Sequence, residues 1–248
     1  MKVSPTSLTT LLAALLWVAA LLIDPRPFAA KSVLLIGVGL LATACVAVVG
    51  MILSGGVWAR RCAVAVIVFT AVLAALRPID TIWVVALAGS ALSVSALLSR
   101  SSARSMRKLP SVSGPPALTV VLSVILLGFP ALLGLSGWDR ATTATVLVGL
   151  SAPVAAFWYA RVLPGGLYGV RLVWPVLAVA MSPAQPPAAA IVSLTGAALV
   201  AAIAWQPSVK LAFHPPREVG TSYPIPPELA PREVLDTARL DDKGRPRP

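Results

Sequence analysis

The strongest constraint on this chain is a succession of apolar runs, most of them close to the length that crosses a bilayer. A helix of about 20 apolar residues spans the hydrocarbon core of a membrane. Water is absent there, so only helices or closed barrels satisfy the backbone hydrogen bonds. Eight runs occur, at residues 8–23, 32–53, 62–76, 81–98, 117–135, 141–159, 172–183 and 188–205. The sequence therefore predicts an all-α integral membrane protein with a bundle of about eight transmembrane helices, of which the seventh is the shortest.

Composition agrees with this fold class. Hydrophobic residues make up 58% of the chain and charged residues only 12%, whereas soluble proteins carry about 25% charged residues. A net charge of +11 would suggest nucleic-acid binding in a soluble domain. Here the 20 lysines and arginines lie between the apolar runs or in the last 43 residues. We therefore expect the lipid bilayer, and not nucleic acid, to surround the protein.

The distribution of basic residues predicts the orientation, because Lys and Arg are enriched in cytoplasmic loops. With the N-terminus inside, nine basic residues before the last span face the cytoplasm: Lys2, Arg60, Arg61, Arg100, Arg104, Arg107, Lys108, Arg161 and Arg171. Four face outward: Arg26, Lys31, Arg77 and Arg140. Eight spans return the C-terminus to the same side. We expect a multi-pass protein of the cell (plasma or inner) membrane with both termini in the cytoplasm.

The chain also aligns with itself. Residues 8–61 match residues 118–171 without a gap, with 13 of 54 positions identical. This similarity predicts a tandem parallel repeat of four helices in each half, with residues 1–98 and 117–205 joined by a basic cytoplasmic connector, 99–116. Chance similarity between apolar sequences is the alternative. Parallel repeats occur among transporters, whose binding sites lie at the repeat interface.

The best-matched stretch of the repeat supplies the candidate binding residues. Each copy reads Gly-Gly, an apolar residue, an aromatic residue and, three positions later, arginine. A glycine pair permits a tight reversal or exposes backbone N–H groups to an anion. An adjacent arginine would then bind a phosphate or carboxylate, such as a lipid headgroup. The alternative is that the glycines only turn the chain and the arginines only set topology. The residues are Gly55, Gly56, Arg61, Gly165, Gly166 and Arg171.

Ionisable residues inside spans usually mark proton relays, ion sites or catalytic centres, and we find none well inside a run. Asp24, Asp80 and Asp139 lie at the ends beside Arg26, Arg77 and Arg140, where we expect exposed loop pairs. No hydrolase or nucleotide-binding motif occurs. His214 is the single histidine, so a metal or acid–base centre built from two histidines is excluded. Cys45 and Cys62 are expected to be small core residues. The sequence thus predicts no metal, no cofactor and no enzyme.

Residues 206–248 contain nine prolines and charges of both signs, a composition typical of a disordered tail. We expect a Pro-rich cytoplasmic tail in which residues 231–240 form a brief helix when bound to a protein partner. Pro231 would stand near its start, with Leu235 and Ala238 on one side. A tail that binds nothing is the alternative.

Two functions fit these features. The first is a non-catalytic subunit or scaffold of a membrane complex, favoured by the charge-free spans and the tail. The second is a permease or facilitator for a small neutral or lipid-like solute passing between the repeat halves, favoured by the repeat and by Pro130, Pro153 and Pro175 within spans. A transferase acting on an anionic lipid is a third and weaker hypothesis, because no catalytic base is visible.

Overall fold

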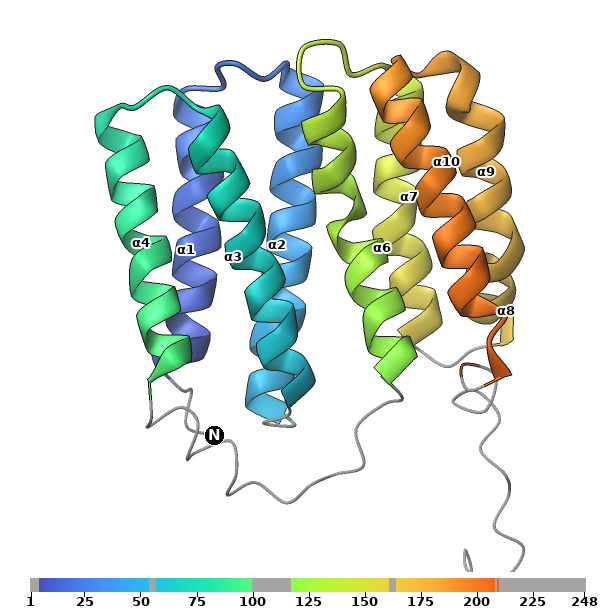
Figure 1. Ribbon diagram of the computed structural model, residues 1–248, viewed down its shortest axis with the longest axis horizontal. Helices are drawn as coiled ribbons and strands as arrows, with labels where there is room; N and C mark the ends of the chain where they lie inside the picture. The colour runs from blue at the N-terminus through green and yellow to red at the C-terminus, as the bar shows by residue number, and fades with distance from the viewer. Residues whose placement is uncertain (1–4, 54–56, 100–116, 161–163, 208, 210–248) are drawn as a thin grey trace, which may run out of the picture. The chain divides into compact units, whose positions relative to one another are not determined.

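The computed structural model describes residues 5–53, 57–99, 117–160, 164–207 and 209. The chain divides into two units, Met1–Phe213 and His214–Pro248. All described residues belong to the first unit; most of them are helical, and none forms a strand (Figure 1). The residues of the predicted connector from 100 to 116 and of the tail from 210 onward lie outside the described part.

Eight segments of the described chain are long and apolar enough to cross a membrane, as the sequence predicts. Seven are single helices: α1 (Pro5–Ile23), α2 (Ala30–Leu53), α3 (Val57–Leu76), α4 (Thr81–Leu98), α6 (Ala117–Ser136), α7 (Thr143–Ala160) and α10 (Pro187–Ala204). The remaining one, Gly165–Ala184, is the seventh span in chain order and is composite.

This composite span is longer than the run 172–183 predicted for it. It joins α8 (Pro164–Tyr168), a π-helical turn (Gly169–Val173), α9 (Trp174–Met181) and a 3₁₀ turn (Ser182–Ala184). Pro175 has no backbone N–H, so it cannot continue the ordinary helical ladder. The N–H of Trp174 instead bonds to the carbonyl of Gly169, five residues back. The helix therefore continues through the proline in a widened turn.

The helices of each half have the same order of neighbours. In the first half α1 packs on α2 and α4, and α3 packs on the same two helices. In the second half α6 packs on α7 and α10, and α9 packs on those two. The connections after α1, α3, α6 and α9 gather at one end of the helices (Figure 1).

The two halves meet chiefly along α2 and α6. A Cβ atom added at Gly39 would lie 2.5 Å from the backbone nitrogen of Ala131, and one at Gly134 would lie 2.8 Å from the carbonyl oxygen of Ser32. Ser32 Oγ donates a hydrogen bond of 2.9 Å to the carbonyl of Gly137. Glycines thus bring the two backbones into direct contact, as small residues commonly do between membrane helices.

A polar seam joins α1 to α4. Trp17 Nε1 donates to Ser90 Oγ at 2.7 Å, and the hydroxyls of Thr10 and Ser93 are 3.3 Å apart. All four side chains are buried. An unmade hydrogen bond costs more in an apolar interior than in water, so these pairs favour this particular register of the two helices.

Candidate functional site

Arg171, one of the predicted anion-binding residues, lies in the π-helical turn and reaches the end of α10. Its Nε donates a 2.9 Å hydrogen bond to the carbonyl oxygen of Ala204. Its guanidinium carbon lies 4.8 Å from the ring centroid of Trp205, a cation–π distance. The last carbonyls of a helix lack intrahelical partners and carry partial negative charge. Arg171 therefore caps α10 while its guanidinium is held against an aromatic ring.

The glycine pair of the same copy has two different environments. A Cβ at Gly166 would lie 2.3 Å from the carbonyl oxygen of Trp158, whereas one at Gly165 would meet nothing within 4 Å. Gly166 therefore allows α8 to pack against the end of α7, which is a structural role. Gly165 is exposed and carries no such constraint.

In the Gly-Gly-arginine stretch of the first half, Gly55 to Arg61, the arginine does not lie with Arg171 in one site. Gly55 and Gly56 lie outside the described residues, and Arg61 is exposed on α3. That helix packs on α1, α2, α4 and α6, whereas the contacts of Arg171 are to the end of α10. The structure therefore does not bring the two arginines into one site.

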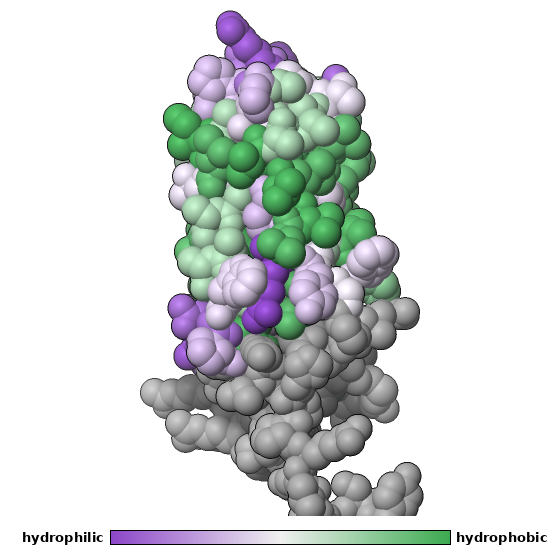
Figure 2. All heavy atoms as spheres, turned by 90° about the vertical axis from the view of Figure 1, so that its right-hand side faces the viewer, coloured by the Kyte–Doolittle hydropathy of each residue, from purple (hydrophilic) through white to green (hydrophobic). Residues whose placement is uncertain are grey.

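Three large aromatic side chains surround this end of the second half. Trp158, Tyr168 and Trp205 are 56, 62 and 59% exposed. Figure 2 views the side of the molecule on which α9 and α10 lie, and shows a strip of hydrophilic atoms between paler residues below a largely hydrophobic surface. Amphipathic rings of this kind settle at the headgroup depth of a bilayer.

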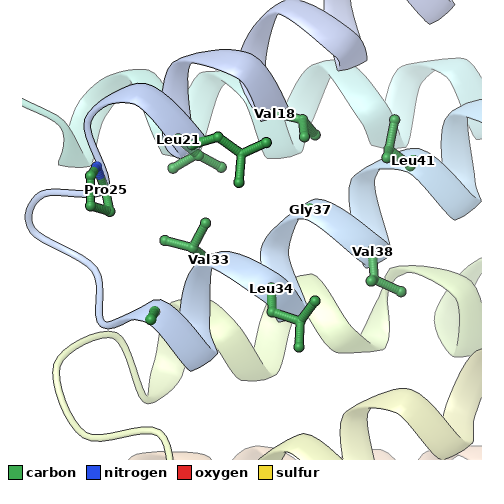
Figure 3. Close-up of a pocket in the computed structure, with 10 residues that line it drawn as sticks. Val18, Leu21, Pro25, Val33, Leu34, Gly37, Val38 and Leu41 are labelled. Atoms are coloured by element: carbon green, nitrogen blue, oxygen red, sulfur yellow. The ribbon is translucent and has the colours of Figure 1, made fainter.

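Two apolar grooves of about 410 Å³ each open between neighbouring helices. The first lies between α1 and α2. Figure 3 shows Val18 and Leu21 facing Val33 and Leu41 across it, with Pro25 at one end. The residues that line it carry no polar side chain, so it can hold hydrocarbon but offers no group for acid–base chemistry.

The second groove lies between α9 and α10. Pro175 and Val179 line it from α9, and Leu194, Ala197 and Ala198 line it from α10. It too is apolar.

Arg77 is one of two residues, with Cys45, whose environment differs from the one that the sequence predicts. Instead of forming an exposed loop pair, its side chain is fully buried, and Asp80 approaches it at 3.4 Å. Nε and Nη1 have no hydrogen-bond partner among the described residues. Arg77 follows Val66, Thr70 and Leu73, all buried, at helical spacings of four, three and four. That periodicity was the available signal that residue 77 continues the buried face of α3.

The other two loop pairs agree better with expectation. Arg26 and Arg140 are about 80% exposed, and their distances to Asp24 and Asp139 are 3.0 and 3.3 Å. The hydrogen bonds from Arg26 hold the pKa of Asp24 below its ordinary value. Such exposed pairs contribute little to stability.

No group of three or more metal-binding side chains occurs in the part of the chain that the structure describes. Cys62 is buried as expected, but Cys45 is exposed on α2, so its assignment to the core is wrong. Position 45 faces outward because Thr43, Ala44 and Ala47 occupy the buried face. The predicted partner-binding residues Pro231, Leu235 and Ala238, and also His214, lie outside the described residues.

Comparison of the chain with protein-family models, curated proteins and solved structures finds no match.

Proposed function

We propose that this chain is a non-catalytic, membrane-embedded subunit or scaffold whose tail, residues 206–248, binds a protein partner. The observation that carries the proposal is the use made of buried polar side chains. Trp17 bonds to Ser90, Ser32 bonds to the carbonyl of Gly137, and Ser193 Oγ donates to Gln185 at 2.7 Å. These groups hold helices and turns together. In transporters and membrane enzymes, buried polar groups instead line a pathway or a reaction centre.

The tail supports the partner-binding part of the proposal by its sequence. It holds seven basic residues and nine prolines, which disfavour a packed domain but suit a segment that folds on a partner. Residues 231–240 carry the spacing of a short amphipathic helix, with Pro231 near its start.

Truncation after Gln206 tests the proposal. Full-length and truncated chains would be purified in mild detergent from the native host, and co-purifying proteins identified by mass spectrometry. We expect a stoichiometric partner with the full chain and its loss on truncation, because the tail holds the contact. Both chains purifying alone and equally folded would contradict the proposal.

Point variants separate a specific contact from a general effect of the tail. Leu235→Ser alters the apolar side of the proposed short helix, whereas Ile225→Ser alters an apolar residue outside it. We expect the first to weaken partner recovery and the second to leave it unchanged. Equal effects of the two variants would place the contact elsewhere in the tail.

A permease remains the second candidate, because both halves show the same neighbour order, as a tandem duplication would produce. A symmetric parallel repeat would place corresponding helices at the interface. Here α2 corresponds to α7 in the sequence alignment and α6 to α1, yet the halves meet chiefly along α2 and α6. This junction is packed backbone to backbone at Gly39, which favours the scaffold. Solute flux through reconstituted vesicles above that of empty vesicles would favour the permease.

The proposal includes a location. The protein lies in the cell membrane with both termini in the cytoplasm. Arg60, Arg61 and Arg171 stand near helix ends opposite the end that carries the connections after α1, α3, α6 and α9 (Figure 1). That distribution supports a cytoplasmic position for the arginine-rich end.

A further inference from the structure

We propose that Arg171 and the groove between α9 and α10 form one binding site for an anionic phospholipid. The phosphate would lie at the guanidinium and one acyl chain would lie in the groove. This inference goes beyond the subunit role and does not depend on it, because it uses only residues of the seventh and eighth spans.

The guanidinium of Arg171 is held in place by its contacts, but not all of its N–H donors have an acceptor among the described residues. Arginine offers five N–H donors, and Arg171 commits Nε to Ala204. Nη1 and Nη2 donate no hydrogen bond to the residues that the structure describes. Within the same residues, the arginines with a carboxylate partner are Arg26, Arg77 and Arg140. Among the described residues Arg171 thus has no carboxylate partner, and its paired N–H donors can bind phosphate oxygens.

The groove continues from the arginine along the same helix pair. Arg171 touches Ala204 and Trp205 of α10, and Pro175, one helical turn further on, lines the groove against α10. On α10 the lining residue Ala198 precedes Ala204 by six positions, which is about 9 Å of helix. A headgroup at Arg171 would therefore lie at the groove's end, with the chain running along the helices.

The groove has the chemistry of an acyl-chain site. Ala197 and Ala198 leave room between the helices, while Val176, Val179 and Leu194 are 63, 51 and 43% exposed. In Figure 2 the hydrophobic surface lies directly beyond the hydrophilic strip. The exposed rings of Trp158, Tyr168 and Trp205 place Arg171 at the depth where lipid phosphates occur.

The groove between α1 and α2 has the same volume, but no arginine without a carboxylate partner stands at its Pro25–Ala30 end. Arg26 pairs with Asp24, and Lys31 Nζ donates to Thr143 Oγ1 at 3.2 Å. Lys31 remains a cation, yet an ammonium lacks the paired N–H donors with which a guanidinium binds two phosphate oxygens. The second groove is therefore the better match for a phospholipid.

Native mass spectrometry of the full chain in detergent tests this site. The protein would be titrated with phosphatidylglycerol and, separately, with phosphatidylcholine of the same acyl chains. We expect phosphatidylglycerol to bind more tightly, and Arg171→Gln to weaken it about tenfold, as the loss of a charge-assisted contact implies. Arg61→Gln removes an exposed arginine of the other half and should leave binding unchanged. Equal binding of the two lipids, or no effect of Arg171→Gln, would overturn the proposal.

A second pair of variants tests the groove without touching the arginine. Ala198→Phe fills the groove from an exposed position, and Ala188→Phe adds the same ring at an exposed position of α10 that does not line it. We expect weaker phosphatidylglycerol binding only for Ala198→Phe. Unchanged binding in that variant, or displacement of the lipid by glycerol phosphate at similar concentration, would indicate a soluble-anion site and contradict the lipid assignment.

Discussion

At the scale of single residues, Asp80 has two roles at the start of α4. Its Oδ1 accepts the N–H of Trp83 at 2.6 Å, and its Oδ2 neutralises the buried Arg77. Asn keeps the capping role but removes the charge. We therefore expect Asp80→Asn to lower the free energy of unfolding by about 1–2 kcal/mol, less than for a fully buried pair because Asp80 is partly exposed. Thermal unfolding in detergent measures this.

Two further variants complete that test. Arg77→Met combined with Asp80→Asn removes the uncompensated charge and should recover the lost stability. Asp139→Asn removes one partner of an exposed pair and should change stability by less than about 0.5 kcal/mol. A double variant that is no more stable than Asp80→Asn alone would show that the buried charge is not the cause.

The sequence predicts the environment of a residue where the periodic spacing of apolar residues is taken into account. The long apolar runs indicated membrane spans, and eight described segments are long and apolar enough to cross a membrane. The seventh of these includes Arg171, which the sequence places just before the span. Arg77 was assigned to a loop because it follows the apolar run, although its spacing from Leu73 already placed it on a buried face. The sequence predicts that Arg171 binds an anion. Its contacts with Ala204 and Trp205 depend on how α10 packs, which no local pattern encodes.

At the scale of elements, two glycines of α2 provide a matched comparison. A Cβ at Gly39 would lie 2.5 Å from the backbone of Ala131, whereas one at Gly37 would meet only Val18 methyl groups at 3.9 Å. Gly39→Ala must separate α2 from α6 and should destabilise the fold by about 1–3 kcal/mol. Gly37→Ala should be neutral or stabilising by up to about 1 kcal/mol, since alanine favours helix. Equal melting temperatures for the two variants would contradict the close approach of α2 and α6.

The seventh span shows why element lengths were harder to predict than element number. The run predicted for this span, 172–183, starts after Arg171 and contains Pro175, and proline interrupts ordinary helices. The π-helical turn instead carries the backbone through Pro175 and extends the span to 20 residues. A widened turn has no sequence signature of its own. Composition therefore predicted that a seventh span exists but not the residue at which it starts.

At the scale of the whole molecule, the orientation in the membrane decides on which side of the bilayer a protein partner could bind. Replacing Cys45 and Cys62 leaves a chain without cysteine, into which single reporters can be placed. Ile79 is 79% exposed in the connection after α3, and Gly165 is exposed near the start of the seventh span with open space around it. These positions lie at opposite ends of the helices (Figure 1).

With the arginine-rich end in the cytoplasm, a membrane-impermeant maleimide added to intact cells should label Ile79→Cys and not Gly165→Cys. Permeabilised cells should show labelling of both, which controls for accessibility. Neither substitution alters a charge, so the reporters leave the basic residues that set topology in place. Labelling of Gly165→Cys alone in intact cells would show that the protein has the opposite orientation in the membrane. The tail would then face away from the cytoplasm if the eight spans are crossed, and a cytoplasmic partner would be excluded.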